Sequence, residues 1–374
     1  MFTVIAVAAL TAAYLILGKL GMFRLDRERS SLKPPRPLPL VSMIIPAYNS
    51  SRTIAKTLES ARKADYPKKE ILVINDSRDS TPSIARSYGV RVIQNRERLG
   101  KPAALNRATQ EARGDILFFL DADTTISRDC LKKLVPWFSQ KDVAAVMPKY
   151  LLRDGSPLSK LASFENLFTF ALLRIHMFFR SMVGFRGCSV AIRKRVLERN
   201  PWPDTLMEDN HLSATLASQG HRVIWEPRAI SRTHEPSTFA DIKKQKRRWG
   251  EGAALAFAHH WRFYLTSPQF ITFLIPYFAL GIVSTLIFLS LLASPLLFPT
   301  LTLPLLLELV MLFIAMYIHT LIFLYLGGGE WHPLATLRFM LIYFPVMLHS
   351  YSRGVLSGAR RKKSKKRELH FHDW

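Results

Sequence analysis

The sequence predicts an α/β domain with a doubly wound, mostly parallel sheet, flanked by N-terminal and C-terminal transmembrane helices. Three observations predict this fold class. Apolar runs alternate with amphipathic stretches of helical length between residues 41 and 120, as in parallel sheets. The run Ile116–Leu120 is wholly apolar, which is typical of a strand buried on both faces. Long uncharged segments lie near both ends of the chain, as expected of membrane spans.

Residues 1–22 are predicted to be an N-terminal transmembrane anchor. Met1 to Gly18 carry no charge, and basic residues follow in a Pro-rich linker, residues 23–40. Because basic residues favour the cytoplasmic side of a membrane, we expect the linker and the next domain in the cytoplasm. A cleaved signal peptide is the alternative, but no basic residue precedes the apolar run and no clear cleavage site precedes Lys19.

The C-terminal segment 268–356 is predicted to contain two spans, Phe270–Leu292 and Leu301–Leu326. Leu334–Ser350 is apolar too, and a basic tail follows at 357–374. A cytoplasmic domain and a cytoplasmic tail need an even number of spans between them, so we expect Leu334–Ser350 to be re-entrant or interfacial. The alternative is three C-terminal spans with the basic tail outside. The expected location is the plasma (cytoplasmic) membrane.

The charge and the cysteines restrict the class of partner. The net charge is +24, but much of the basic excess lies beside the membrane segments, so anionic membrane lipids are the expected partner and nucleic acid is not. No nucleic-acid-binding motif is recognisable in the sequence. Cys130 and Cys188 are the only cysteines, too few for a disulfide framework, and we expect both to be reduced thiols.

The cytoplasmic domain is predicted to cover residues 41–250. The expected strands are Val41–Ile45, Glu70–Ile74, Val90–Gln94 and Ile116–Leu120, and the expected helices are about Arg52 to Lys63, capped by Ser50 or Ser51, and Lys101–Ala112. The carboxyl ends of parallel strands form one edge of the sheet, where ligands bind. We therefore expect a site suited to a nucleotide and its metal at that edge, made of Tyr48, Asn49, Asp76, Asp121 and Asp123.

Asp121 and Asp123 follow the buried strand directly. Side chains two residues apart on an extended chain point the same way, so both carboxylates can share one hard cation, Mg²⁺ or Mn²⁺. The alternative is that Asp-Ala-Asp opens a turn and that the next helix is capped at Ser127.

Six short strings resemble, in their order, the motif set of family 2 glycosyltransferases, and within it the branch that contains cellulose synthase, hyaluronan synthase and ceramide glucosyltransferase. They are P-A-Y-N at 46–49, V-I-N-D-S-R-D-S-T at 73–81, R-L-G-K-P-A-A-L-N at 98–106, D-A-D at 121–123, M-E-D at 207–209 and Q-K-R-R-W at 245–249. Each string alone is weak, but six in the right order over residues 41–260 are a strong signal. The resemblance implies a GT-A fold, a nucleotide-sugar donor and inversion at the anomeric carbon.

The resemblance also implies the residues of the donor side. Asp76 would contact the nucleobase, Lys101 would lie near the nucleotide, and Asp121 and Asp123 would hold the metal on the diphosphate, with Asp123 the more direct ligand. The residue types agree, because a carboxylate can accept a base N–H and a lysine can meet a phosphate; a solvated lysine in a first helical turn is the alternative for Lys101. Two departures from the family leave uracil and guanine both open: Ser50 follows Asn49 where Glu is usual, and Asn75 replaces an aspartate.

The second half of the chain is expected to hold the acceptor. Leu161–Phe179 is predicted to be an amphipathic core or interface helix, and the turn at 184–189, before a strand at Val190–Ile192, stands where the family has a Gly-rich acceptor loop. The resemblance implies that Asp209 is the general base, with Glu208 beside it on the acceptor side. The alternative for Asp209 is an N-cap of a helix at Asn210–Ser218. His211 stands where the family often has an aspartate, and no role is assigned to it.

Gln245, Arg248 and Trp249 have the spacing i, i+3, i+4 and share one helix face. The resemblance implies that Gln245 and Arg248 hold the donor diphosphate and that Trp249 lies under the acceptor. The alternative is a basic amphipathic helix at the membrane surface. We expect residues 251–267 to be an interfacial helix, and we assign to lipid contact the basic side chains of Lys243, Lys244 and Arg262.

These features predict an integral-membrane, metal-dependent inverting glycosyltransferase that moves a sugar, most favourably from a UDP-sugar, to a hydroxyl of a lipid or glycan acceptor. Few spans are available to enclose a polar polymer path, which favours a glycolipid or lipid-linked acceptor over a processive polysaccharide synthase. A membrane scaffold without catalysis is disfavoured because Asp123 and Asp209 are both present.

Overall fold

The computed structural model describes residues 2–153, 156–236, 238–330 and 332–363, without the side chains of residues 2, 273–281, 284, 296–297 and 361–363. These residues form two compact units that alternate along the chain. The sheet unit comprises Asp26–Lys160, Arg180–Phe263 and the chain from Met347 onward. The helical unit comprises Met1–Leu25, Leu161–Phe179 and Tyr264–Val346.

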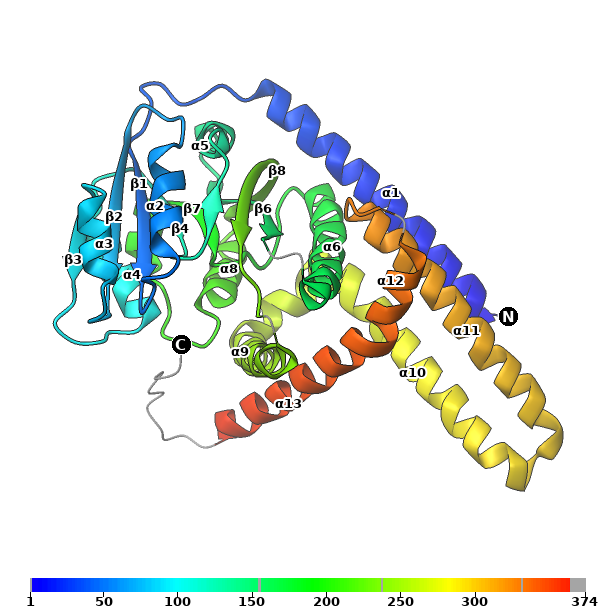
Figure 1. Ribbon diagram of the computed structural model, residues 1–374. Coiled ribbons are helices and arrows are strands. Elements are labelled where there is room, and N and C mark those ends of the chain that lie inside the picture. Colours follow the sequence, from blue (N-terminus) through cyan, green and yellow to red (C-terminus); the bar gives the residue numbers. More distant parts are fainter. Residues whose placement is uncertain (1, 154–155, 237, 331, 364–374) are drawn as a thin grey trace. The chain divides into compact units, whose positions relative to one another are not determined.

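The sheet unit is built on eight strands in the order β3-β2-β1-β4-β7-β6-β8-β5 (Figure 1). The first half is parallel: β1 (Val41–Ala47) pairs with β2 (Lys69–Asn75) and β4 (Ile116–Leu120), and β3 (Arg91–Gln94) pairs with β2. This half confirms the predicted strands, and every residue of β4 is buried.

The second half of the sheet is mixed. Strand β7 (Ser189–Arg193) is antiparallel to both β4 and β6 (Val143–Leu152), whereas β8 (Arg222–Thr233) is parallel to β6 and antiparallel to the short β5 (Thr125–Ile126). The predicted mostly parallel α/β fold is therefore confirmed, with antiparallel pairing confined to the half that follows β4.

Helices connect these strands. They are α2 (Ile54–Arg62), α3 (Thr81–Ser87), α4 (Lys101–Glu111), α5 (Cys130–Leu134) with the 3₁₀ turn η1 (Val135–Ser139), α7 (Lys194–Arg199), α8 (Glu208–Ser218) and α9 (Phe239–Thr266). One predicted cap, at Ser50 or Ser51, is wrong, and so is the cap at Ser127 that was named as an alternative. The N-cap of α2 is Thr53, and Ser50 contributes its backbone carbonyl, which accepts from Thr53 and Ile54 N–H groups. The N-cap of α5 is Asp129 and not Ser127.

Gly114 shows why the sequence places glycine just before β4. A Cβ at this position would lie 2.6 Å from the backbone nitrogen of Ser42 and 2.7 Å from the carbonyl oxygen of Leu40. The Gly114 N–H also donates to Ser42 Oγ over 2.8 Å. Only a residue without a side chain allows β1 and the start of β4 to approach this closely.

The predicted linker 23–40 begins as helix. Helix α1 runs from Phe2 to Ser31, beyond the predicted end of the anchor at residue 22. Its last turn is held on β8 by two ion pairs, Glu28 with Arg222 at 2.7 Å and Arg29 with the fully buried Glu226 at 2.8 Å. Buried charges need such partners, and these pairs account for helical order in a segment whose polarity alone suggests a linker.

The helical unit contains most of α1, helix α6 (Pro157–Phe178), α10 (Pro268–Leu297), α11 (Pro299–Leu326), α12 (Pro333–Arg338), the π-helical turn η2 (Phe339–Tyr343) and the start of α13 (Phe344–Lys363). The segment Leu161–Phe179, which lies within the predicted domain 41–250, belongs to the helical unit. Its Ala171 and Ile175 form an apolar cluster with Tyr14, Phe323 and Leu326.

Small residues and paired polar groups join these helices. A Cβ at Gly21 would lie 2.0 Å from the carbonyl oxygen of Arg174, so α1 and α6 meet backbone to backbone. In α11, His319 Nδ1 lies 2.7 Å from Thr11 Oγ1, and Glu308 accepts a hydrogen bond from the Thr3 hydroxyl. The polar residues that interrupt α11 are thus satisfied by α1, as polar groups within membrane helices must be.

Among the described residues, three helices are long and apolar enough to cross a membrane: Thr3–Ser31, Pro299–Leu326 and Pro333–Arg360. They agree with the predicted anchor and with the predicted span Leu301–Leu326. The predicted span Phe270–Leu292 lies in α10, but the side chains of residues 273–281 and 284 are outside the described residues. The helix Pro333–Arg360 contains Leu334–Ser350 and is long enough to cross a membrane. Its length therefore supports the alternative of three C-terminal spans, and the re-entrant arrangement stays a prediction. Residues 364–374 of the predicted basic tail are also outside the described residues.

Candidate active site

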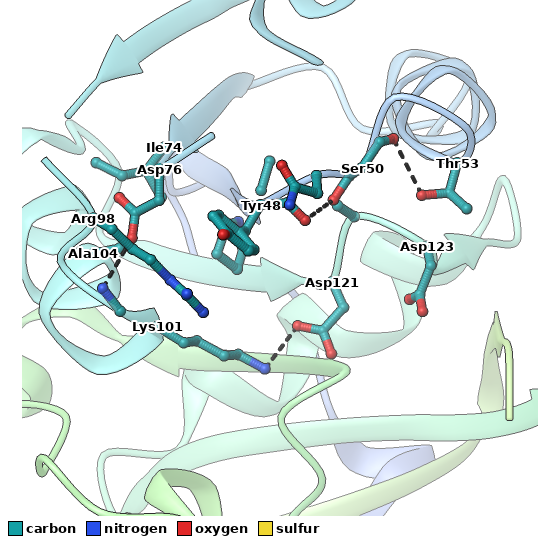
Figure 2. Close-up of a pocket in the computed structure, with 15 residues that line it drawn as sticks. Tyr48, Ser50, Thr53, Ile74, Asp76, Arg98, Lys101, Ala104, Asp121 and Asp123 are labelled. Atoms are coloured by element: carbon teal, nitrogen blue, oxygen red, sulfur yellow. Dashed lines mark hydrogen bonds and ion pairs between the residues drawn. The ribbon is translucent and has the colours of Figure 1, made fainter. Parts of the chain in front are cut away.

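A pocket of about 330 Å³ lies at the carboxyl ends of β1, β2 and β4 (Figure 2). The parallel register pairs Ala47 of β1 with Asn75 of β2, so the segments that follow these strands meet at the same edge. The pocket brings together all six residues predicted for the donor and the metal from this half of the chain: Tyr48, Asn49, Asp76, Lys101, Asp121 and Asp123.

Asp76 shapes the loop that leads into α4. Its Oδ2 accepts the backbone N–H groups of Leu99 at 3.1 Å and Gly100 at 3.0 Å, and its Oδ1 accepts from the Asn95 side chain. Gly100 has φ 79°, a left-handed conformation that glycine adopts without strain. The carboxylate of Asp76 therefore fixes the turn that presents Lys101 to the pocket.

Arg98 lies over the ring of Tyr48, with its guanidinium carbon 4.1 Å from the ring centroid (Figure 2). This cation–π contact holds a positive charge and an aromatic face in the same pocket. Both groups suit a nucleotide, because the charge attracts phosphates and the ring can stack on a base. The sequence analysis included Arg98 in a motif but gave it no role.

Lys101 links the pocket to α8. Its Nζ lies 2.9 Å from Asp121 Oδ1 and 3.5 Å from Glu208 Oε1. Burial disfavours the charged lysine, but the carboxylates of Asp121 and Glu208 outweigh this effect and raise the pKa of Lys101 above its usual value. Lys101 is therefore a fixed positive charge between two acidic groups, and the alternative of a solvated lysine is wrong.

Asp123 is the more enclosed of the two aspartates. Its Oδ1 accepts from Thr124 Oγ1 at 3.0 Å and from Thr233 Oγ1 at 3.5 Å. Burial, and then the negative charge of Asp121, raise the pKa of Asp123. Two carboxylates in one pocket supply the hard oxygen donors that Mg²⁺ and Mn²⁺ prefer, so the residues present fit such an ion.

Glu208 and Asp209 begin α8 next to Lys101. Burial raises the pKa of Glu208 to about 7, against the opposing effect of Lys101. Asp209 is not the N-cap of α8, because Met207 holds that position. Asp209 Oδ1 does accept the Asn210 N–H at 2.7 Å within the first turn of the helix. Asp209 Oδ2 accepts the Gly187 N–H at 2.7 Å, and a Cβ at Gly187 would lie 3.2 Å from the same oxygen. Glycine at 187 therefore allows the turn at 184–189 to close onto the carboxylate.

Two cationic side chains approach the ring of Trp249, Lys246 from α9 and Arg186 from the turn at 184–189. The guanidinium of Arg186 is 4.7 Å and the ammonium of Lys246 is 3.7 Å from its ring centroid. Glu235 joins the same two elements, since it accepts from Gln245 Nε2 at 3.1 Å and pairs with Arg186 at 3.4 Å. The predicted residues Gln245, Arg248 and Trp249 thus share α9 but do not line the pocket of Figure 2.

Sequence reasoning missed the side chains that connect the predicted ones. Arg98 and Lys246 stand in two of the six strings without an assigned role, Arg186 stands in the turn at 184–189, and Glu235 follows the last strand outside any string. The spacing i, i+3 was the available signal for Lys246 beside Trp249, but only the fold brings residues 186 and 249 together.

The two cysteines are free thiols, as predicted. Burial raises the pKa of the Cys188 thiol to about 12 and that of Cys130 further still. Both are therefore protonated near neutral pH, and neither is suited to act as a nucleophile.

Comparisons with known proteins agree with the motif set. Residues 42–200 match the family model for glycosyl transferase family 2. The chain is 30% identical over 233 residues to the probable glycosyltransferase YdaM of Bacillus subtilis (strain 168), covering 58% of this chain and 55% of that protein. It is 28% identical over 222 residues to the poly-beta-1,6-N-acetyl-D-glucosamine synthase of Staphylococcus epidermidis, covering 57% of this chain and 54% of that protein. The chain thus spans about half the length of the curated relatives that it matches.

The fold also matches a solved structure. The mannosyltransferase PcManGT from Pyrobaculum calidifontis, solved in complex with GDP-Man and Mn²⁺, superposes with a TM-score of 0.57 at 24% identity, covering 87% of this chain and 97% of that chain. This likeness confirms the predicted GT-A fold.

Proposed function

Because residues 42–200 are a family 2 glycosyltransferase domain, we propose that this chain is an integral-membrane, inverting enzyme that transfers a sugar from a nucleotide diphosphate sugar to a hydroxyl of a lipid or lipid-linked acceptor. The observation that carries the proposal is the contact series Asp121–Lys101–Glu208. It connects the pocket proposed for the nucleotide with the helix that bears Asp209, so that the donor and the general base belong to one site.

The donor occupies the pocket of Figure 2 in this proposal. The nucleobase lies toward Tyr48, Asn49 and Asp76, and the diphosphate meets the positive charges of Arg98 and Lys101. UDP is the favoured nucleotide, and GDP is the alternative because a structural neighbour of this fold was solved with GDP-Man. Gln245 and Arg248 contribute to the diphosphate from α9.

Asp121 and Asp123 would hold a Mg²⁺ or Mn²⁺ ion. When bound, such an ion acts as a Lewis acid that stabilises the charge on the leaving diphosphate. Lys101 orients Asp121 through their 2.9 Å contact. Thr124 and Thr233 hold the Asp123 carboxylate at the pocket wall.

Asp209 is the proposed base. The acceptor hydroxyl oxygen attacks the anomeric carbon, the bond from that carbon to the diphosphate oxygen breaks, and the hydroxyl proton passes to Asp209. The Gly187 N–H orients Oδ2 of the carboxylate at 2.7 Å and the Asn210 N–H orients Oδ1 at 2.7 Å, so the base is held by two backbone donors. Glu208 and Trp249 are the proposed acceptor contacts.

The proposed location is the plasma membrane, with the sheet unit facing the cytoplasm. Lys243, Lys244 and Arg262 are exposed on α9, as a helix seated on anionic headgroups requires. Trp261 is also exposed, and tryptophan is favoured at a membrane surface.

Processive polysaccharide synthesis is the second candidate, because the relatives of Staphylococcus are named as polysaccharide synthases. A test separates the two. The purified chain in lipid nanodiscs is given labelled UDP- and GDP-sugars together with an Escherichia coli lipid extract, and label is measured in the organic-soluble and the high-molecular-weight fractions. Label in the lipid fraction supports the first proposal, label in a growing polymer supports the second, and no transfer from any donor contradicts both.

A further inference from the structure

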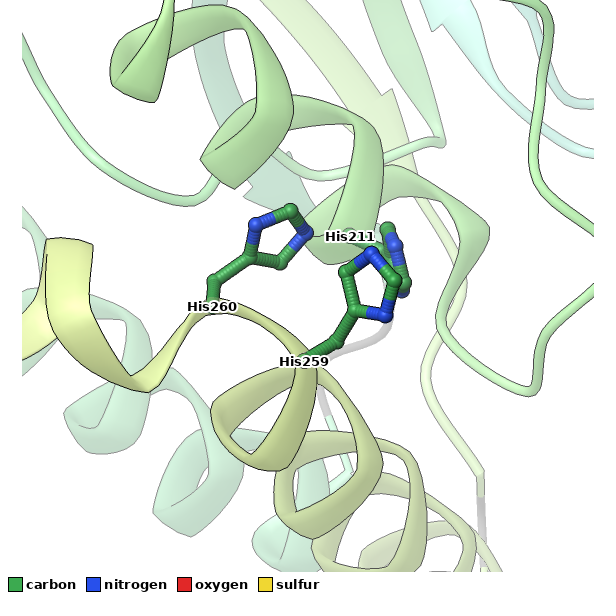
Figure 3. Close-up of side chains that lie close together, drawn as sticks. All are labelled: His211, His259 and His260. Atoms are coloured by element: carbon green, nitrogen blue, oxygen red, sulfur yellow. The ribbon is translucent and has the colours of Figure 1, made fainter.

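Three histidines lie together where α9 packs against α8, the helix that begins with Glu208 and Asp209. His211 is on α8, and His259 and His260 are on α9 (Figure 3). One ring nitrogen from each lies within 4.8 Å of the others. The ring centroids are 4.6 to 4.7 Å apart. All three residues belong to the sheet unit.

A break in α9 creates this arrangement. Side chains of consecutive residues on a regular helix point about 100° apart, so His259 and His260 would not face one target. At His260 the backbone leaves the helical region, with φ −110° and ψ 24°. Figure 3 shows the result, in which both imidazoles turn toward His211.

Gly252 brings α9 close enough to α8 for this contact. A Cβ at Gly252 would lie 2.6 Å from Met207 Cγ. His259 is seven residues further along α9, two turns later on the same face. The close approach at Met207 therefore holds the face of α9 that bears His259 against the start of α8, the helix that carries His211.

The imidazoles have the properties of metal ligands. His211 Nδ1 is buried and has no hydrogen-bond partner among the described residues. A neutral imidazole offers a lone pair from one nitrogen. Three such rings that converge without a carboxylate suit Zn²⁺, and they do not suit the hard ions Mg²⁺ and Mn²⁺.

The distances allow one ion to bind all three residues. Zinc–nitrogen bonds of 2.0–2.1 Å place tetrahedral ligands about 3.4 Å apart. The observed separations of up to 4.8 Å close to this value by small side-chain rotations. His259 is exposed and free to turn, and a hydroxyl is present beside the cluster, since Thr215 Oγ1 lies 3.4 Å from His260 Nε2.

We propose that His211, His259 and His260 bind one Zn²⁺ ion, at a site separate from the Asp121–Asp123 pair. The fourth position is left to water. The ion ties α8, which begins with Glu208 and Asp209, to α9, which carries Gln245, Arg248 and Trp249. It is thus a positioning site that fixes one helix relative to the other, and it stands on the histidine geometry whether or not the proposed transfer reaction is correct.

Zinc binding by the full chain in detergent tests the proposal. Bound metal is first removed from the protein with a chelator. Zn²⁺ is then titrated into the protein by calorimetry in a buffer with excess Mg²⁺, which is meant to occupy the Asp121–Asp123 pair. The variants are His211→Ala, His259→Ala and His260→Ala. His221→Ala, a histidine in the turn before β8 and outside the cluster, is the matched control, and Asp123→Asn reports on the other metal site.

We expect one equivalent of Zn²⁺ in the parent, in His221→Ala and in Asp123→Asn. Each variant of the cluster should bind Zn²⁺ at least about tenfold more weakly. Loss of a group that only hydrogen-bonds to a metal ligand already weakens metal binding 10-fold to 100-fold. Zinc should also raise the thermal unfolding midpoint of the parent but not of the cluster variants. His259→Ala keeps the test decisive, since an exposed side chain is removed without disturbing the core.

Three outcomes would overturn the site. These are a parent chain that takes up no Zn²⁺ in Mg²⁺, cluster variants that bind as tightly as the parent, and binding that disappears in Asp123→Asn or His221→Ala while His259→Ala retains it.

Discussion

At the scale of single residues, the charge balance of the site depends on Lys101. It contacts Asp121 and Glu208 at once, and two buried acidic groups of like charge would otherwise repel each other. The same lysine therefore supports two carboxylates with different expected tasks. Substitutions of the acidic groups around it separate those tasks.

The first prediction concerns the metal. Asp123→Asn replaces a charged oxygen donor by an amide of the same shape, so the fold should persist while sugar transfer falls to background. Excess EDTA should have the same effect on the parent, and added Mn²⁺ should restore it. Transfer is measured with labelled donor in nanodiscs. Asp129→Asn, an aspartate outside the pocket, is the control with parent activity, and full parent activity in EDTA would contradict the metal assignment.

The second prediction concerns the base. Asparagine at 209 keeps one side-chain oxygen for the Gly187 N–H, so the turn at 184–189 should keep its place, and the Asn210 N–H in the first turn of α8 is left to water. Asparagine cannot take a proton, and loss of a positioned base costs about 100-fold to 10,000-fold in rate. We expect Asp209→Asn to bind donor and unfold thermally like the parent but to lose transfer.

Glu208→Gln is the matched comparison for that experiment. It should lose less activity than Asp209→Asn if Asp209 alone takes the proton. The opposite order would exchange the two roles, and near-parent rates in both variants would make the motif structural.

The third prediction follows from the pKa of Glu208, which burial raises to about 7 from an ordinary value of 4.5. Between these values the folded chain binds a proton at Glu208 that the unfolded chain has lost, so the free energy of unfolding falls as pH rises through this window. The contribution is on the order of 3 kcal/mol at most. Thermal midpoints of parent and Glu208→Gln should coincide near pH 4.5 and diverge toward pH 8, with the glutamine variant more stable. Midpoints that stay parallel across this range would show that Glu208 titrates normally.

Among the predicted site residues, those next to strand ends are the ones that the structure brings together in one pocket. Asp121 and Asp123 follow a strand whose burial is evident from five apolar residues, and parallel register brings Tyr48 and Asp76 to the same edge. The position of Asp209 was less accessible. Its partner is the backbone of Gly187, and a backbone contact between segments 22 residues apart leaves no trace in side-chain type.

At the scale of elements, α9 is held by a glycine contact with α13. A Cβ at Gly250 would lie 2.0 Å from the carbonyl oxygen of Tyr351, and one at Gly354 would lie 2.0 Å from that of Arg247. Gly358, four residues after Gly354, would place a Cβ 2.7 Å from the carbonyl oxygen of Glu251. The two helices therefore meet backbone to backbone, as small residues at four-residue spacing allow.

The fourth prediction tests this contact. Gly354→Leu must push α13 away from the turn of α9 that holds Arg248 and Trp249. Overpacking of this kind costs roughly 1–3 kcal/mol, and we expect a lower unfolding midpoint together with reduced transfer. Ser352→Leu adds the same side chain at an exposed position two residues earlier and should change stability by less than about 0.5 kcal/mol. Equal effects of the two changes would mean that the glycine contact has no special weight.

Helix contacts of this kind limit what the sequence reveals about elements. The helices α2, α4 and α8 of the sheet unit were predicted with ends within a few residues, whereas the shorter α3, α5 and α7 were not predicted. The pairing of α9 with α13 and the break at His260 were not predicted, because both depend on which distant backbone lies opposite. The helical order of residues 26–31 was missed for the same reason, since it depends on Glu226 and Arg222 of a distant strand.

At the scale of the whole molecule, the chain passes repeatedly between two units. Helix α6 leaves the sheet unit after β6 and the chain returns at Arg180, before β7. The sequence suggested an amphipathic helix there but not its unit, because an apolar helix face packs equally well on a sheet or on other helices. A Cβ at Gly21 or at Gly327 would lie 2.0 Å from a carbonyl oxygen of α6, so both glycines allow close backbone packing against this helix. This packing explains why α6 belongs to the helical unit.

The last prediction decides the number of membrane crossings. The helix Pro333–Arg360 is long and apolar enough to span, yet the basic residues that follow it favour the cytoplasmic side. The contact of Gly354 and Gly358 with α9 adds a constraint within the sheet unit, because the second half of α13 must lie on the same side of the membrane as α9. We therefore expect a tag inserted at residue 30 and a tag after Trp374 to report the same, cytoplasmic, compartment in spheroplast protease protection. A tag in the turn between α10 and α11, near Pro299, should report the opposite compartment. Opposite compartments for the tags at 30 and 374 would require three C-terminal crossings, and they would also exclude the contact between α9 and α13 in the membrane-inserted chain.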